Sequence, residues 1–213
     1  MAQDYPVFLK LRNKLCVVVG GGKVAARKAA SLLDSGADVR VVSPELTPAL
    51  RELAAQGRIA WRAGPYSVEA LAGAFLVVGA TGEAAVNRQV AADCETRGLP
   101  VNIVDAPELC SFIVPAVVKR GSLVIAVSTG GASPALSRRI REQLEEQFDE
   151  SYSVLLAALG EARARVRQNV PDPVRRKEIF AALYEPDLLS VLKQDGTAAL
   201  FARINEITGG LYA

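Results

Sequence analysis

The sequence predicts an α/β protein that begins with a doubly wound parallel sheet of the Rossmann type. Three observations carry this prediction. Short β-branched runs alternate with helical stretches over residues 15–104, a glycine-rich turn joins the first run to the first helical stretch, and the pattern changes after Asp105. We therefore expect a Rossmann domain over residues 1–110, a hairpin region over 111–150 and an all-helical domain over 151–213.

Composition excludes several classes of function. The chain has 213 residues and is 50% hydrophobic, which is enough for a sizeable core and too apolar for a disordered protein. Its 25 basic and 23 acidic residues leave a formal charge of +2, so no overall field favours nucleic acid or a membrane surface. Because histidine is absent, imidazole catalysis and histidine-ligated metal sites are excluded, and we expect no resident metal.

The chain is expected to be soluble and cytoplasmic. The N-terminus resembles neither a secretory signal nor a transit peptide, and no apolar run is long enough to span a bilayer. The three cysteines, Cys16, Cys94 and Cys110, are odd in number and lack CxxC spacing. Reduced thiols are the simplest interpretation.

Five strands are expected in the first domain, with helices between them. Residues 24–35 and 84–97 have helical character, and each stretch ends at a glycine, Gly36 or Gly98, where a left-handed cap is common. The third strand has the weakest pattern. The expected strands cover residues 15–20, 39–43, 58–62, 75–80 and 101–104.

After Asp105 two apolar runs, residues 111–118 and 122–128, are separated by only three residues. A parallel crossover needs a dozen or more residues, so these runs should pair antiparallel as a hairpin that leaves the Rossmann domain. Pro115 indicates an edge or irregular position for the first strand. The alternative, an extension of the same sheet, fits the pattern equally well.

From Pro134 onward the sequence is helical. Two apolar stripes recur at helical spacing and are interpreted as core. Pro171 and Pro173 interrupt the run, and two or three shorter helices should follow before Gly209 and Gly210. The first stripe is Leu136, Ile140, Leu144 and Phe148, and the second is Tyr152, Leu155, Leu156, Leu159 and Val166.

The strongest local signal lies between the first strand and the first helix. Gly20, Gly22 and Ala25 occupy the G-x-G-x-x-(G/A) positions of a dinucleotide-binding turn. Gly20 permits a tight turn, Gly22 lets the backbone approach a pyrophosphate, and Ala25 allows the helix to pack closely on the strand. The alternative is a glycine-rich turn without a ligand. The predicted contacts of the turn are Gly20, Gly21, Gly22, Lys23, Val24 and Ala25.

The acidic residue that usually binds the adenine ribose is absent. The end of the second strand holds Ser43 and Pro44 instead, with Glu45 close by. No arginine stands in the next two positions to receive a 2′-phosphate, so the residues favour NAD over NADP as cofactor. Ser43 and Pro44 are predicted cofactor contacts.

Two further strands end in polar residues. Thr81 and Gly82 follow the fourth strand at the carboxyl edge, where such sheets bind ligands, and Asn87 lies on the next helix. We predict that all three contact the cofactor, and an N-cap role for Thr81 is the alternative.

Asp105 ends the fifth strand at the same edge. Without histidine, a carboxylate is the natural proton acceptor for a dehydrogenase, so Asp105 is the candidate general acid/base, with a turn-forming role as the alternative.

A second candidate anion site lies at residues 128–139. Ser133 is expected to cap a helix that starts at Pro134, and Gly130 and Gly131 expose backbone amides. A well-capped helix with solvated arginines is the alternative. The predicted substrate contacts are Ser128, Gly130, Gly131, Ser133 and Arg138.

Together these segments resemble the precorrin-2 dehydrogenase family, which includes the N-terminal module of sirohaem synthase. The likeness lies in VVGGGKVAARK, NIVDAPELCSFIVPAVVKRG and AVSTGGASPALSRRIREQLE and covers about the first 150 residues. The resemblance implies a Rossmann domain, a dimerisation region with exchanged strands at 111–150, a C-terminal helical domain and a homodimer.

The resemblance also implies an activity. It is oxidation of precorrin-2 to sirohydrochlorin with NAD as hydride acceptor, with Asp105 as the carboxylate tied to catalysis. Some members also insert ferrous iron into sirohydrochlorin, and this sequence does not decide that step. Precorrin-2 would come from another protein, because no methyltransferase domain is fused. A non-enzymatic NAD-binding sensor and a dehydrogenase of another small anionic substrate are the alternatives.

Overall fold

The computed structural model describes residues 4–184 and 187–211. These residues divide into two compact units, with the division between Val114 and Pro115. The first unit is the α/β unit, and the second contains a hairpin and helices. The expected fold class is confirmed, whereas the three-part division of the chain stays a prediction.

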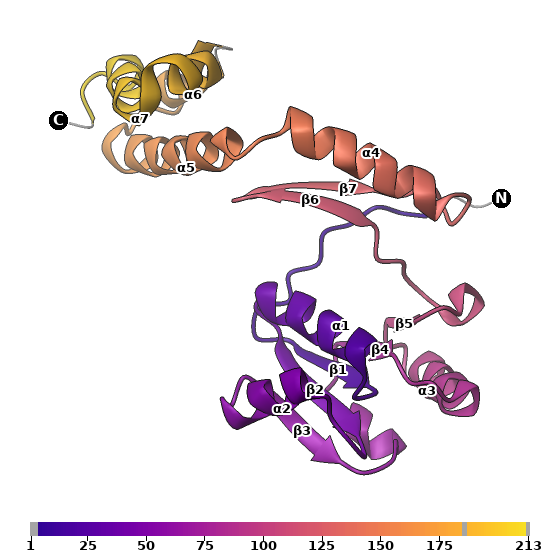
Figure 1. Cartoon of the computed structure of the whole chain (residues 1–213). Helices are drawn as coiled ribbons and strands as arrows, with labels where there is room; N and C mark the ends of the chain where they lie inside the picture. The colour runs from indigo at the N-terminus through magenta and orange to yellow at the C-terminus, as the bar shows by residue number, and fades with distance from the viewer. Residues whose placement is uncertain (1–3, 185–186, 212–213) are drawn as a thin grey trace. The chain divides into compact units, whose positions relative to one another are not determined.

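The α/β unit is built on five parallel strands in the order β3-β2-β1-β4-β5 (Figure 1). All five strands expected from the sequence are present. This order places the carboxyl ends of β1 and β4 next to each other at the point where the chain reverses direction across the sheet, which is where doubly wound sheets bind ligands. The strands are β1 Leu15–Val19, β2 Asp38–Ser43, β3 Ile59–Ala63, β4 Leu76–Gly79 and β5 Val101–Ile103.

Helices cover both faces of the sheet. Alternate residues of β1 point to opposite faces, and since these residues are apolar, both faces have to be buried. Cys16 and Val18 pack in a core with α1 (Lys23–Asp34) and α2 (Pro48–Ala55). Val17 and Val19 pack in a second core, which includes residues of α3 and η1. α3 is Ala84–Thr96, and η1 is the short 3₁₀ helix Val68–Leu71.

The link between β3 and β4 is the least regular part of the unit. It contains only η1, where an alternating pattern would place a full helix. Gly64 and Gly73 both adopt positive φ angles, of 129° and 75°, and Pro65 follows the first of them. Gly64 and Pro65 precede η1 and Gly73 follows it, and these residue types do not favour a longer helix. The segment between them therefore forms a single 3₁₀ turn.

The second unit begins with an antiparallel hairpin of β6 (Ala116–Arg120) and β7 (Leu123–Val127). It forms a sheet of its own, so the antiparallel pairing is confirmed and the alternative of an extended Rossmann sheet is wrong. The first strand begins at Ala116 rather than at Ser111 as predicted. Pro115 lacks the N–H that a ladder needs, so pairing begins directly after it.

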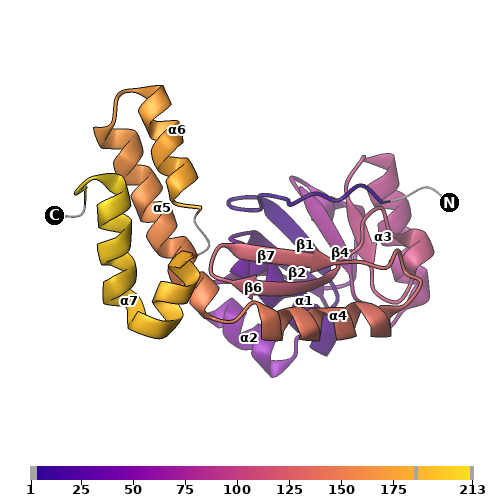
Figure 2. The ribbon, with the colours of Figure 1, turned by 90° about the horizontal axis from the view of Figure 1, so that it is seen from above.

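Helix α4 (Pro134–Gln147) lies along the hairpin (Figure 2). The prediction that Leu136 belongs to a core stripe is wrong within the single chain, since its side chain is 48% exposed. Ser137 is the buried residue of this helix, and Ile140 and Leu144 are only half-buried. A two-stranded sheet is too narrow to cover the whole apolar side of a fourteen-residue helix.

Three further helices pack together at the end of the chain (Figure 2). They are α5 (Ser151–Asn169), α6 (Pro173–Ala182) and α7 (Asp187–Thr208). The break predicted at Pro171 and Pro173 is confirmed, and the Asp172 carboxylate caps α6 by accepting hydrogen bonds from Val174 N and Arg175 N. α7 is kinked at Gly196, where φ is 86° and ψ is −176°.

The cysteines are free, as expected. Burial raises the pKa of both Cys16 and Cys94 to about 11, with Asp38 and Asp93 respectively adding to the effect, so both thiols stay protonated at neutral pH. Within the described ranges, no helix combines the length and the apolar character that a membrane crossing requires.

Burial of leucines predicts which substitutions destabilise the protein. Leu50 on α2 is fully buried, whereas Leu9, which precedes β1, is 46% exposed. Leu50→Ala should lower the free energy of unfolding by about 2–5 kcal/mol because it leaves a cavity. The matched Leu9→Ala should cost less than about 1 kcal/mol. Urea unfolding followed by circular dichroism measures both, and equal losses would contradict this assignment of the core.

Candidate cofactor and substrate site

The turn between β1 and α1 is held by close backbone contacts. Gly20 has φ of 126° and donates its N–H to the Val42 carbonyl at 2.9 Å. A Cβ at this position would collide with the carbonyl oxygen of Ala80, and one on Gly21 would collide with that of Glu45. Both glycines are therefore required by the chain itself.

Gly22 differs from its two neighbours. A Cβ placed on it meets no protein atom within 4 Å, and its backbone is extended, with φ of −81°. Nothing inside the protein therefore explains a glycine here. The residue is the N-cap of α1, so free space opens at the positive end of a helix dipole. A pyrophosphate fits this space, because it gains from close backbone N–H groups and has no Cβ to avoid.

A cleft of about 280 Å³ opens beside this turn at the carboxyl edge of the sheet. Seven predicted cofactor contacts line it, which are Gly20, Gly21, Gly22, Ser43, Pro44, Thr81 and Gly82. The other four do not: Lys23 is exposed, Val24 is half-buried, and Ala25 and Asn87 are buried. Ala25 belongs to the core shared by α1 and the sheet, as its small size predicts.

Thr81 and Asn87 form a pair that shapes the wall of the cleft. The Asn87 amide donates to Thr81 O at 3.1 Å, and Thr81 Oγ1 donates to Asn87 Oδ1 at 3.0 Å. Thr81 Oγ1 also accepts a hydrogen bond from Glu83 N. The N-cap of α3 is Glu83, so the alternative N-cap role of Thr81 is wrong, because the hydroxyl serves the loop before the helix.

Sequence reasoning missed part of the lining. Pro65, Tyr66, Glu83 and Val86 also border the cleft. The Tyr66 hydroxyl donates to Asp93 Oδ2 at 2.8 Å, and burial, with this hydrogen bond, raises the pKa of Tyr66 far above its usual value. The available signal was the position of Gly64-Pro65-Tyr66, directly after the third strand at the same edge of the sheet.

The end of β2 contains no carboxylate that could bind a ribose. Ser43 is buried, and its carbonyl oxygen accepts hydrogen bonds from Trp61 Nε1 at 3.0 Å and Gly64 N at 3.3 Å. The Glu45 backbone packs against Gly21 instead. Ser43 and Pro44 line the cleft at this edge, and Glu45 is exposed directly after them.

Asp105 follows β5 in a rare backbone conformation. Its φ is 60°, which side chains other than glycine, asparagine and aspartate adopt with strain, and its side chain is exposed. Half-buried Lys28 on α1 is close enough to interact electrostatically. Burial and, next, the charge of Arg27 lower the pKa of Lys28, while the Asp105 carboxylate opposes that shift. Asp105 is thus an accessible carboxylate beside a lysine at the carboxyl edge of the sheet.

The predicted anion site of the second unit is a well-ordered helix start. Ser133 caps α4 by accepting a hydrogen bond from Leu136 N at 3.2 Å, and Pro134 is the first helical residue, as predicted. Gly130 and Gly131 have φ angles of 60° and 82°. The residues nearby are joined by polar contacts: Gly130 N donates to Ser128 Oγ, Thr129 Oγ1 contacts Ser137 Oγ, and Arg138 Nε donates to Glu142.

Comparison with known proteins identifies the relatives of this chain. A family model described as putative NAD(P)-binding matches residues 7–116, and one described as sirohaem biosynthesis protein central matches residues 120–147. A siroheme synthase of Methylobacillus flagellatus is 44% identical over 183 residues, which are 86% of this chain and 39% of that protein. Siroheme synthase 3 of Aeromonas hydrophila is 39% identical over 99% of this chain and 44% of that protein.

The chain therefore spans about two fifths of the length of these curated relatives. A solved structure of similar size also matches. It is described as SirC, precorrin-2 dehydrogenase, and it superposes with a TM-score of 0.82 at 30% identity, covering 95% of this chain and 100% of that one.

The contrast between Gly20 and Gly22 gives a test of the cleft. Gly22→Ala should keep the thermal midpoint of the wild type, because its Cβ meets no protein atom, while NAD affinity falls at least about tenfold, or about 1.4 kcal/mol. Gly20→Ala should instead lower the thermal midpoint, because of its positive φ and its collision with Ala80. Thermal unfolding and isothermal titration with NAD measure both effects. Unchanged affinity in the Gly22 variant would mean that no ligand approaches this backbone.

Proposed function

The chain belongs to the family of NAD(P)-binding sirohaem biosynthesis proteins, and on that basis we propose that it oxidises precorrin-2 to sirohydrochlorin with NAD as the hydride acceptor. One observation carries the proposal: the chain aligns with the whole length of a precorrin-2 dehydrogenase at 30% identity. The open backbone at Gly22 supports it, because that turn suits the cofactor such a reaction needs.

The cofactor would lie across the carboxyl edge of the sheet. Gly20, Gly21 and Gly22, with the N-terminus of α1, would hold the pyrophosphate. Ser43 and Pro44 would border the adenosine side, and Thr81 and Gly82 would border the nicotinamide side. When bound, NAD supplies a ring carbon that accepts hydride. Asn87 would act indirectly, by fixing Thr81 through their two hydrogen bonds.

Asp105 would accept the proton that leaves as hydride departs. The oxidation removes two electrons and two protons from the macrocycle, so one hydride goes to NAD and one proton needs a base. Asp105 is exposed, so it can receive that proton and pass it to water. Its positive φ is supporting evidence, because sparsely populated backbone conformations concentrate at functional sites.

The carboxylates of the substrate need donors, and the start of α4 offers them. The proposed substrate set is the Gly131 backbone amide, the hydroxyls of Ser128 and Ser133, and the Arg138 guanidinium. Gly130 belongs to the set through the shape of the loop, because its own N–H donates to Ser128 Oγ. Among residues 4–184 and 187–211, Arg138 pairs with Glu142 through Nε alone, so its remaining donors are available for a substrate carboxylate.

A homodimer is part of the proposal. In the hairpin unit Val124 and Leu136 are 37% and 48% exposed, although both lie in elements with apolar patterns. A two-stranded sheet is also marginally stable alone and has exposed edges that a second copy can pair with. A cytoplasmic location stays a prediction, and the insertion of ferrous iron into sirohydrochlorin is not part of the proposed function.

The proposed reaction predicts NADH formation when the chain is incubated anaerobically with precorrin-2 and NAD. Asp105→Asn should keep NAD affinity and lower the rate at least about 100-fold, which is the scale of a general base. Asparagine also tolerates a positive φ, so the backbone is preserved. Absorbance at the nicotinamide and tetrapyrrole bands follows the reaction.

Asp34→Asn is the matched control, because Asp34 ends α1 and is exposed. It should turn over at the wild-type rate. If the wild type forms no NADH while it still binds NAD, the NAD-binding sensor replaces the enzyme. If Asp105→Asn is as fast as Asp34→Asn, the base lies elsewhere.

The proposed dimer predicts that a charge on the hairpin separates the subunits. Val124→Lys should weaken self-association at least about tenfold, since an unpaired ammonium would be buried between the copies. Val174, on α6, is 67% exposed, and Val174→Lys is the matched control that should associate like the wild type. Sedimentation velocity over a concentration series measures both. A wild type that remains monomeric at every concentration would refute the dimer.

A further inference from the structure

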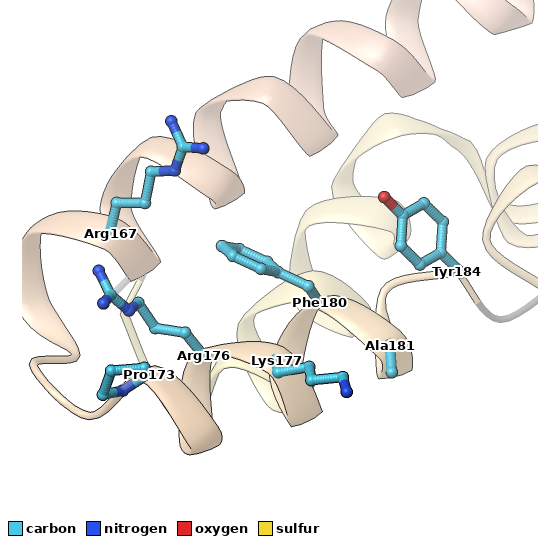
Figure 3. A pocket seen from close by; sticks show the side chains of 7 residues that line it. All are labelled: Arg167, Pro173, Arg176, Lys177, Phe180, Ala181 and Tyr184. Carbon is cyan, nitrogen blue, oxygen red and sulfur yellow. The ribbon is translucent and has the colours of Figure 1, made fainter.

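Helix α6 and the end of α5 form a groove that the proposed reaction does not use. Its volume is about 580 Å³, which is within the range of pockets for small molecules. We call it the α5–α6 groove. Figure 3 shows its lining, which consists of Arg167, Pro173, Arg176, Lys177, Phe180, Ala181 and Tyr184.

The spacing of the lining residues explains why they gather. Residues 173, 176, 177, 180, 181 and 184 follow the pattern i, i+3, i+4, i+7, i+8 and i+11, so they share one face of α6 and its continuation. Arg167 comes from the last turn of α5. Figure 3 shows Arg167 and Arg176 toward one end of the groove, with Phe180 between them and Tyr184.

The groove is positively charged. It has three cations, Arg167, Arg176 and Lys177, and no Asp or Glu among the described residues that line it. Nearby carboxylates are already engaged, since Glu178 pairs with Arg175 at 2.9 Å and Asp172 caps the helix. In the described part of the chain, no carboxylate forms an ion pair with any of the three lining cations, so their charges are available to a ligand.

The groove also presents aromatic surface. Phe180 is half-buried, and the guanidinium carbon of Arg163 lies 4.5 Å from its ring centroid. That contact fixes the ring and brings a fourth cation to its vicinity. Tyr184 is 76% exposed, which is unusual for an aromatic side chain beside a pocket and leaves its ring free to stack.

From this combination we propose that the α5–α6 groove binds a planar polycarboxylate, and, resting on the proposed function, that this ligand is the tetrapyrrole itself, held there by residues other than those assigned to the reaction. Guanidinium groups bind carboxylates with two parallel hydrogen bonds, and flat apolar rings stack on aromatic side chains. Charge alone would attract any anion. Charges placed around Phe180 and Tyr184 favour a flat body with an acidic rim.

The test uses uroporphyrin, a flat tetrapyrrole octacarboxylate that the dehydrogenase cannot oxidise, titrated into the full chain without NAD. Absorbance should show two classes of site in the wild type. Arg176→Gln should weaken one class at least about tenfold, and Tyr184→Ser should weaken the same class. Arg175→Gln removes the same charge from the adjacent position outside the groove, so it is the matched control and should bind like the wild type.

Two outcomes overturn the inference. One is that Arg176→Gln titrates like Arg175→Gln, which would mean that the groove does not bind the porphyrin. The other is that a single-stranded oligonucleotide displaces the porphyrin at equal concentration in an Arg176-dependent way, which would assign the groove to nucleic acid. A failure of the proposed function can be told apart from these outcomes. In that case precorrin-2 and NAD give no NADH, while Arg176→Gln still weakens uroporphyrin binding. The second result would continue to support a planar polycarboxylate site.

Discussion

The close packing of the β1–α1 turn against its neighbours is the constraint on which the α/β unit depends. Gly20 touches the backbone after β4, and Gly21 touches the backbone after β2, so three strand ends converge on two residues that cannot carry a side chain. This contact fixes the start of α1 over the sheet edge. The third glycine, Gly22, makes no such close contact with the backbone of another strand end. The space beside it is part of the cleft.

Much of this arrangement could be read from the sequence, because local rules and the fold agree. The runs that became β1, β2, β4 and β5 are β-branched and buried on both sides, and the stops at Gly36 and Gly98 have the positive φ that a helix end favours. Ser133 before Pro134 likewise predicted a cap that the structure contains. In these cases no distant contact was needed to decide the outcome.

The sequence predictions failed where tertiary contacts, and not local sequence, determine the role of a residue. Thr81 has the chemistry of an N-cap, yet its hydroxyl is used by Asn87 and Glu83 before the helix begins. Leu136 has helical spacing with apolar neighbours, yet the narrow hairpin does not cover it. Tyr66 lines the cleft because the chain turns at Gly64 and Pro65 and the β3–β4 link forms a 3₁₀ turn instead of a full helix, and only its position directly after the third strand signals this in the sequence.

The kink of α7 has a consequence for how helices α5, α6 and α7 fold. At Gly196 the backbone adopts a conformation that is essentially restricted to glycine, so α7 is in effect two helical segments of about ten residues. Isolated helices of that length are marginal in water. Neither segment can therefore be a stable seed on its own, and the apolar cluster of Leu200, Ile204 and their partners on α5 and α6 must assemble together. Helices α5, α6 and α7 should therefore behave as a single cooperative foldon. We expect the three helices to unfold together rather than one turn at a time from the end of α7.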